Sequence, residues 1–257
     1  MSQANQKPRK PQLPPKATRG QPPGAARTAV NGIRVLVFLK EPRAGKVKTR
    51  LGLTVGYQNA ARLYRAFLAD TLSTVAGPRN WALEAHFEPG TASPNRIRAL
   101  IPLELRKRFR LVPQPRGTLG KRLATAFDRA FREGARTVLA VGSDCPLLQP
   151  KHLEQALRAL RRRDLVLGPA RDGGYYLIGL RQPQRQLFQR IPWSTPRVLV
   201  RTLERADELG LETFLLEELP DIDTREDLLT LRERLVDEAG GVAPSTSSTL
   251  GAMRLKL

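Results

Sequence analysis

The feature that most constrains the fold is an alternation, between about residues 33 and 236, of short apolar runs with longer amphipathic stretches. The runs at 33–39, 82–87 and 137–141 have the length and apolar character of buried strands, and the stretch 57–75 carries apolar residues at helical spacing. Strands that alternate with helices are joined by crossovers. The pattern therefore predicts an α/β fold, with a mostly parallel sheet flanked by helices.

The rest of the chain continues this alternation. Further strands are expected at 109–112, 165–167, 175–180 and 212–216, and further helices at 123–131, from 150, at 196–209 and at 224–236. The strands 165–167 and 175–180 are joined by residues 171–174 (RDGG), a sequence typical of hairpin turns. Ligands bind such sheets at the carboxyl ends of the strands. The loops after residues 39, 112 and 141 are therefore the expected place of a site.

Composition separates a central domain, residues 31–238, from two tails. Residues 1–30 are basic and proline-rich without apolar periodicity, which predicts a disordered tail, and the Gly/Ser/Thr-rich residues 239–257 predict a flexible one. No apolar run approaches the roughly 20 residues that span a bilayer, and the start of the chain lacks the apolar core of a secretory signal. We expect a soluble, cytoplasmic protein without a membrane span.

The charge balance points to an anionic partner. Lysine and arginine number 44 against 24 acidic residues, for a formal net charge of +20. The basic runs at 106–110 and 161–163 make a nucleic-acid-binding module one alternative, but aromatic residues are only 5% and no nucleic-acid reader motif is present. The two histidines lack zinc-ligand spacing, and no G-x-S-x-G elbow supports a hydrolase.

The loop after the first strand concentrates positive charge. Lys40, Lys46, Lys48 and Arg50 lie within eleven residues around Gly45. Converging beside a strand end, they would form a phosphate site, although a solvated basic surface is the alternative. The position directly after a strand favours phosphate binding. The loop does not fit the Walker A motif, which needs a glycine five places before Gly45 and Ser or Thr directly after Gly-Lys.

Two acidic positions could hold a metal ion. Asp144 follows the strand 137–141, where a carboxylate commonly binds Mg²⁺ or Mn²⁺ that bridges substrate phosphates. The alternative is a turn or cap before Pro146. Asp223 lies just before the predicted last helix, and on sequence alone an N-cap is its favoured role. Cys145 is interpreted as a small buried side chain.

Six motifs occur in a fixed order between residues 34 and 235: FLKEPRAGKVKTRLG, QPRGTLGKRL, VGSDCPLL, LGPARDGGYYLIGL, IPWST and LPDIDTREDL. In this the chain resembles the bacterial radical-SAM/selenodomain-associated transferases, also called arsenosugar-biosynthesis glycosyltransferases. The resemblance implies a Rossmann-like GT-A nucleotide-diphospho-sugar transferase fold. It also implies a relation to molybdenum-cofactor nucleotidyltransferases and to phospholactate guanylyltransferase.

The resemblance also implies roles for particular residues. The nucleotide-binding set is Lys40, Gly45, Lys48, Thr49 and Arg50 toward the phosphates, and Gln114, Gly117 and Leu119 toward the base or ribose. The metal ligands for Mg²⁺ or Mn²⁺ are Asp144 and Asp223, and the catalytic residues are Asp144, Asp172 and Lys48. The acceptor-side set is Asp172, Gly173, Gly174, Tyr175, Trp193 and Ser194.

These observations predict a transferase that passes a glycosyl group from a nucleotide sugar to a small-molecule acceptor. The alternative on the same fold is a nucleotidyltransferase, which joins an NTP to a phosphorylated acceptor and releases pyrophosphate. Both reactions need nearly the same residues. Because Asp144 and Asp223 both follow strands that end at one edge of the sheet, they are expected within about 10 Å of each other, around one divalent cation.

Overall fold

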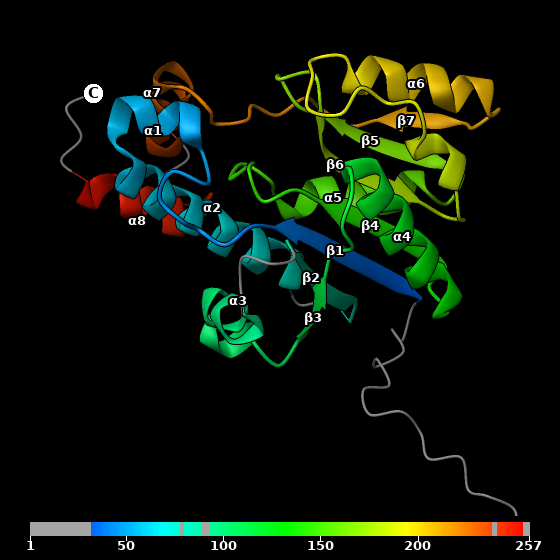
Figure 1. Cartoon of the computed structure of the whole chain (residues 1–257), viewed down its shortest axis with the longest axis horizontal. Helices are drawn as coiled ribbons and strands as arrows, with labels where there is room; N and C mark the ends of the chain where they lie inside the picture. Colours follow the sequence, from blue (N-terminus) through cyan, green and yellow to red (C-terminus); the bar gives the residue numbers. More distant parts are fainter. Residues whose placement is uncertain (1–31, 78–79, 89–92, 238–240, 254–257) are drawn as a thin grey trace, which may run out of the picture.

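The computed structural model describes residues 32–77, 80–88, 93–237 and 241–253, so the predicted tail 1–30 lies outside the described residues. Within these ranges seven strands form one sheet in the order β3-β2-β1-β4-β6-β5-β7 (Figure 1). The strands are β1 (Ile33–Leu39), β2 (Ala82–Phe87), β3 (Phe109–Pro113), β4 (Thr137–Val141), β5 (Leu165–Pro169), β6 (Tyr175–Leu180) and β7 (Thr213–Leu215).

The sheet is mostly parallel, as the sequence predicts. β1 pairs in parallel with β2 and β4, and β3 extends the sheet in parallel beyond β2. β6 runs antiparallel to both β4 and β5, because the turn at residues 171–174 folds β6 back on β5 as a hairpin. β7 pairs in parallel with β5. The carboxyl ends of β1, β2, β3, β4 and β5 therefore share one edge of the sheet.

Helices cover both faces, and the alternation of side chains along β1 shows why. Val35 and Val37 face one core, together with side chains of α2 and α5, whereas Leu36 between them faces a second core with α4 and α6. All three are fully buried, so β1 is apolar on both sides. The helices are α1 (Thr49–Val55), α2 (Tyr57–Ala76), α3 (Pro94–Leu100), α4 (Leu119–Arg132), α5 (Pro150–Ala159), α6 (Val198–Glu208), α7 (Arg225–Asp237) and α8 (Pro244–Ala252), with short 3₁₀ turns η1 (Leu103–Leu105) and η2 (Arg185–Phe188).

The prediction of a flexible tail at 239–257 is wrong for residues 244–252. Residues 244–252 form α8, which packs along α2. Asp70 of α2 is buried and accepts hydrogen bonds from the backbone amides of Ser245 and Thr246 at 2.9 and 2.8 Å, so its carboxylate takes the place of an N-cap. That contact joins residues far apart in sequence. None of the helices in the described ranges has the length and apolar character needed to cross a membrane.

Candidate functional site

The loops after β1 and β4 are joined by one buried tyrosine. Tyr64 of α2 accepts a hydrogen bond from the backbone amide of Lys40 at 3.0 Å, and its hydroxyl pairs with Ser143 Oγ at 2.7 Å. Tyr64 and Ser143 are both buried, and burial raises the pKa of the phenol. The phenol thus remains a neutral hydrogen-bonding group that fixes the two site loops next to each other.

Replacing Tyr64 by phenylalanine tests this link. The change removes one hydroxyl and leaves the Lys40 amide and the Ser143 hydroxyl without that partner. We expect the free energy of unfolding to fall by about 1–3 kcal/mol, the usual cost of unsatisfied buried polar groups. Urea denaturation of the two proteins measures this. Equal stability would mean that water replaces the lost hydroxyl and that the loops do not depend on it.

The centre of the site is a lysine beside three aspartates, with a fourth aspartate close to one of them. Lys48 Nζ lies 2.9 Å from Asp223 Oδ1 and 3.6 Å from Asp144 Oδ1. Because both carboxylates contact the same ammonium group, they lie within a few ångströms of each other, well inside the 10 Å expected for one shared cation. Asp221 and Asp172 add further negative charge. We call Asp144, Asp172, Asp221 and Asp223 the acid cluster.

The electrostatics of this cluster favour a cation. Burial alone would lower the pKa of Lys48, but the charges of Asp144, Asp223 and Asp221 raise it above its ordinary value, so the lysine stays charged. Burial, together with repulsion from Asp172, raises the pKa of Asp221. Three carboxylates act on one ammonium group, and Asp172 adds a fourth charge beside Asp221, so the cluster has an excess of negative charge.

The donor chemistry of the acid cluster fits a hard divalent cation such as Mg²⁺ or Mn²⁺, which prefers carboxylate oxygens. In the described part of the chain, no three or more His, Cys, Asp and Glu side chains are arranged to hold a metal by themselves. Water and substrate phosphates would therefore supply the remaining ligands, as is common for Mg²⁺. Side chains of Asp144 and Asp223 are 61% and 32% exposed, so both remain accessible.

The other predicted phosphate residues lie near Lys48 in the sequence. Lys40, Thr49 and Arg50 are exposed, and Gly45 has a left-handed backbone with φ of 72°. Among the described residues no carboxylate pairs with Lys40 or Arg50. Lys48 itself, predicted to bind phosphate, instead lies on the carboxylates of the predicted metal ligands. The loop thus offers free cations on its surface and one cation held inside the acid cluster.

Gln114 lies at the end of β3, but its side chain already has protein partners. Its Nε2 donates to the His86 carbonyl oxygen at 2.7 Å, and its Oε1 accepts from Arg122 at 3.3 Å. Arg122 also donates to the Gly117 carbonyl oxygen at 3.0 Å. Gln114 and Gly117, predicted near the base or ribose, are therefore joined through one guanidinium. Leu119 is 42% exposed at the start of α4, beside them in the chain.

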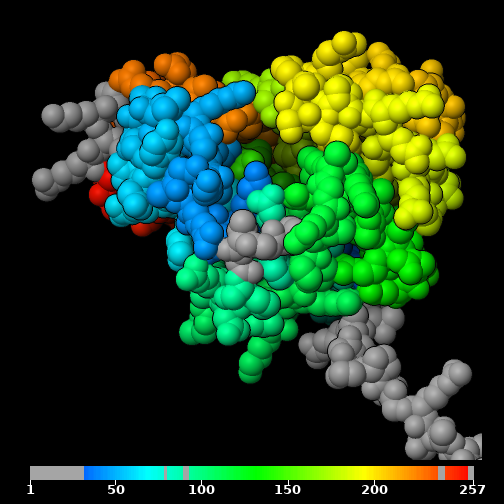
Figure 2. All heavy atoms as spheres, viewed as in Figure 1, coloured from blue at the N-terminus to red at the C-terminus, as the bar shows by residue number. Residues whose placement is uncertain are grey.

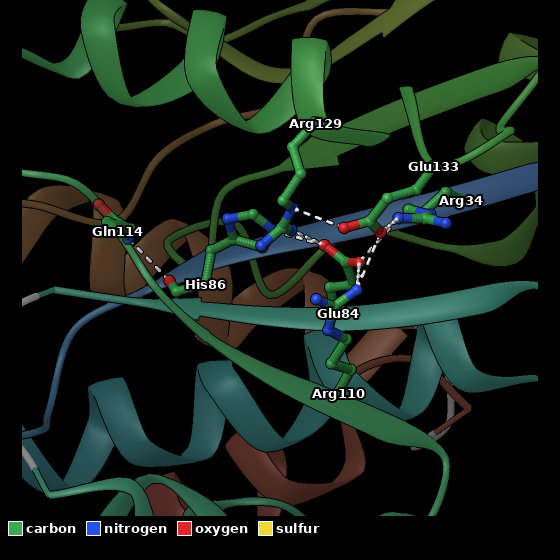
Figure 3. Close-up of polar contacts among 7 residues, drawn as sticks. All are labelled: Arg34, Glu84, His86, Arg110, Gln114, Arg129 and Glu133. Atoms are coloured by element: carbon green, nitrogen blue, oxygen red, sulfur yellow. Dashed lines mark hydrogen bonds and ion pairs between the residues drawn. The ribbon is translucent and has the colours of Figure 1, made fainter. Parts of the chain in front are cut away.

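A buried ionic network lies between the sheet and α4, next to Gln114 (Figure 3). Glu84 of β2 is 2% exposed and contacts His86 at 2.8 Å and Arg34 at 3.1 Å, and it also pairs with Arg129 of α4. The ring of His86 stacks on Phe38 with centroids 5.0 Å apart. Each charge has an opposite partner, so the network positions α4 and the strand that carries His86 without leaving a carboxylate unpaired.

The predicted acceptor-side residues come from two segments that meet. Asp172 accepts a hydrogen bond from the Gly174 amide at 2.8 Å, which shapes the hairpin turn. Gly173 has φ of 82°, and a Cβ added there would lie 2.0 Å from the Pro196 carbonyl oxygen, so only glycine fits. Beyond the turn, the rings of Tyr175 and Trp193 meet edge to face with centroids 6.4 Å apart. The exposed Ser194 follows Trp193.

Asp221 was not among the predicted site residues, although a local pattern indicates that it faces the same way as Asp223. Ile222 is fully buried, and in an extended segment the residues on either side of a buried one face the opposite way. Asp221 and Asp223 are those two residues. Cys145 packs beneath this segment with its Sγ 3.7 Å from the Pro220 carbonyl oxygen, and burial raises its thiol pKa to about 12. Cys145 is thus a packing residue, as expected.

The basic run 106–110 is largely used within the fold. Arg106 donates to the Ile101 carbonyl oxygen at 3.1 Å, Arg108 donates to the Gly77 carbonyl oxygen at 2.8 Å, and Arg110 pairs with Glu133 at 2.9 Å. These arginines satisfy backbone carbonyls and a carboxylate. They do not form a free cationic face of the kind that a nucleic-acid module needs.

Comparisons with known proteins agree with this architecture. The model of a bacterial family described as "Uncharacterized protein conserved in bacteria (DUF2064)" matches residues 71–195. A solved structure from Desulfovibrio desulfuricans G20, provisionally described as a nucleotide-diphospho-sugar transferase, is similar with a TM-score of 0.79 and 34% sequence identity. The match covers 86% of this chain and 95% of that one. The predicted nucleotide-diphospho-sugar transferase fold is confirmed.

Two curated enzymes are similar over part of the chain, and both are 2-phospho-L-lactate guanylyltransferases. The protein from Methanocaldococcus jannaschii is 30% identical over 112 residues, which are 42% of this chain and 48% of that protein. The protein from Methanopyrus kandleri is 37% identical over 92 residues, which are 35% of this chain and 46% of that protein. The chain spans about half the length of the curated relatives it matches.

Proposed function

The chain belongs to the bacterial DUF2064 family, and on that premise we propose that it is a nucleotidyltransferase, which joins a nucleoside triphosphate to a small phosphorylated acceptor and releases pyrophosphate. From the sequence, glycosyl transfer is the first prediction and nucleotidyl transfer the second. We reverse that order, because the two curated relatives are guanylyltransferases. The narrower relation to radical-SAM/selenodomain-associated transferases stays a prediction.

One observation carries the proposal. The acid cluster lies directly against a loop whose Lys40 and Arg50 are exposed and pair with no carboxylate of the described residues, at the carboxyl edge of a mostly parallel sheet. Figure 2 shows this face of the molecule hollowed between the blue segment that includes the loop and the yellow segment around residue 195. A triphosphate with a bound metal ion needs both kinds of charge side by side.

The residues of the chain would divide the work as follows. Asp144 and Asp223 would hold Mg²⁺ or Mn²⁺, which when bound neutralises charge on the phosphates. Lys40 and Arg50 would pair with phosphate oxygens that become more negative as pyrophosphate leaves. In the reaction an oxygen of the acceptor phosphate bonds to the α-phosphorus of the NTP, and the bond from that phosphorus to the bridging oxygen breaks. Asp172, at the hairpin turn, would face the incoming acceptor.

Product analysis tests the proposal against glycosyl transfer. The purified protein is incubated with Mg²⁺ or Mn²⁺, each of the four NTPs and a panel of phosphorylated small acids, and pyrophosphate release is measured. Parallel reactions contain nucleotide sugars, and release of nucleoside diphosphate is measured. Pyrophosphate that depends on both NTP and acceptor supports nucleotidyl transfer. Release of nucleoside diphosphate from a nucleotide sugar in the presence of an acceptor, with no pyrophosphate release from any NTP, would establish glycosyl transfer instead.

Alanine substitution of Lys40 and Arg50 tests the phosphate loop. Each change should weaken nucleotide affinity by about 1–3 kcal/mol, the range for one charged hydrogen bond. Isothermal titration of NTP in the presence of Mg²⁺ measures this. The matched control is a double substitution of Arg161 and Arg162 by glutamine, since both are exposed and precede β5 at the opposite edge of the sheet. Equal affinity of the Lys40→Ala/Arg50→Ala protein and the wild type would assign the loop to the solvated surface.

A further inference from the structure

A second group of cations lies outside the acid cluster and the phosphate loop. The segment after η2 and the start of α6 border a shallow, open hollow of about 360 Å³. It is lined by Arg190, Ile191, Pro192, Arg197 and Arg201. Three of the five side chains are guanidinium groups, so positive charge is concentrated in a small volume. We call this the arginine hollow.

Two of these arginines have no acidic partner among the residues that the structure describes. Arg201 pairs with Glu204 and Glu208, each at 2.9 Å. Arg190 and Arg197 are exposed, and within the described ranges no carboxylate pairs with either of them. A guanidinium has five donors in a fixed fork that matches the oxygens of phosphate or carboxylate. The hollow therefore contains two guanidinium groups without an acidic partner in the described part of the chain, and a third, that of Arg201, which pairs with two glutamates of its own helix.

The segment that carries these arginines is held in place. Ile191 is buried, and Trp193 packs so closely on Gly120 of α4 that an added Cβ there would lie 2.4 Å from the indole nitrogen. Thr195 Oγ1 donates to the Pro192 carbonyl oxygen at 2.7 Å. Arg190 adopts a left-handed backbone with φ of 59°, which is rare for a residue with a side chain. An ordered segment loses little entropy when it binds a ligand.

The hollow also adjoins the acceptor side of the site. The Pro196 backbone lies against Gly173, and the amide of Leu199 donates to the Gly173 carbonyl oxygen at 2.8 Å. Arg197 directly follows Pro196, so its backbone is fixed on the turn that carries Asp172. The yellow segment that includes the hollow borders the recess of Figure 2 on the side opposite the phosphate loop.

We infer that the arginine hollow is a binding subsite for an anionic group of the acceptor, a phosphate or a carboxylate. The acceptor assignment rests on the proposed function, whereas anion binding by the hollow does not. The NTP also carries phosphates, and the same forks could bind them. The position of the hollow favours the acceptor as the source of the anion. The exposed cations of the phosphate loop lie beside the acid cluster, where the NTP would bind, whereas the hollow lies beyond Asp172.

Trp193 makes the hollow directly observable, because it lies in the same segment. The chain has two tryptophans, so replacing Trp81 by phenylalanine leaves Trp193 as the single reporter. We expect inorganic phosphate to change its fluorescence saturably, whereas chloride at equal ionic strength does not. In this background, Arg190→Gln/Arg197→Gln should weaken phosphate binding at least about tenfold, as expected for losing charged hydrogen bonds. Arg161→Gln/Arg162→Gln, with the same loss of charge, should leave it unchanged.

Two results would overturn the inference of an anion site. One is phosphate affinity in Arg190→Gln/Arg197→Gln equal to that of the control. The other is a fluorescence change that does not saturate or that chloride reproduces. A second titration, with NTP and Mg²⁺, separates the sources of the anion. Unchanged NTP affinity in Arg190→Gln/Arg197→Gln supports the acceptor subsite, whereas an equal loss for NTP and phosphate would overturn it. If NTP binds to none of the proteins, the proposed function fails while the phosphate result still decides the anion site.

Discussion

Replacing Asp144 by asparagine should reduce turnover at least about a hundredfold, the scale expected when a group that stabilises transition-state charge is lost. Asparagine keeps the size of the side chain but removes the negative charge that would hold Mg²⁺ or Mn²⁺. The Mn²⁺-dependent part of nucleotide affinity should disappear with it. Pyrophosphate release and nucleotide titrations with and without Mn²⁺ measure the two effects.

The fold should survive this change. Asp144 is 61% exposed, and Lys48 keeps its 2.9 Å contact with Asp223, so no buried charge loses its last partner. Thermal unfolding should therefore move by little more than for Asp207→Asn, which removes an exposed carboxylate of α6. Asp207→Asn should retain full turnover. Normal turnover in the Asp144→Asn protein would remove the acid cluster from the mechanism.

The main elements of the fold could be predicted because they depend on local pattern. β1 was expected at 33–39 and is found there, since its run is apolar toward both cores. α8 could not be predicted from its own sequence, which is rich in serine and threonine. It depends on Asp70, a carboxylate more than 170 residues away in the chain. Long-range capping of this kind leaves no signal in a local window.

The distinction between what local pattern predicts and what depends on distant contacts also holds for the candidate site. The meeting of Asp144 and Asp223 follows from strand direction, so topology alone could place them together. The position of Lys48 between them could not be predicted. It depends on a left-handed backbone, with φ of 45°, directly before α1, whose first residues were expected to belong to the loop. A single unusual backbone angle thus moves the side chain from the phosphate loop into the acid cluster.

Replacing Glu84 by glutamine should lower the free energy of unfolding by about 3–5 kcal/mol at pH 7, the usual cost of breaking a buried ion pair. Glu84 is 2% exposed, and its partners include Arg34, itself 3% exposed, and Arg129 of α4. Glutamine fills the same space but leaves these guanidinium groups without their shared carboxylate. Urea denaturation measures the loss. The control is Glu212→Gln, which breaks an exposed pair with Arg163 and should cost at most about 1 kcal/mol.

The pH dependence of the free energy of unfolding provides an independent check on the charge of Glu84. Burial alone would raise the pKa of Glu84, but the hydrogen bond from His86 and the charges of Arg129 and Arg34 hold it below its ordinary value. A lowered carboxyl pKa stabilises the fold above the unfolded value of about 4.3, and this stabilisation is lost as pH falls through the folded pKa.

Burial also lowers the pKa of His86, so wild-type stability should begin to fall below about pH 6.5. In Glu84→Gln the histidine part of this decline should remain, whereas the further loss below about pH 4.3 should be smaller than in the wild type. Parallel stability curves for both proteins down to pH 3 would show that Glu84 does not carry the charge assigned to it.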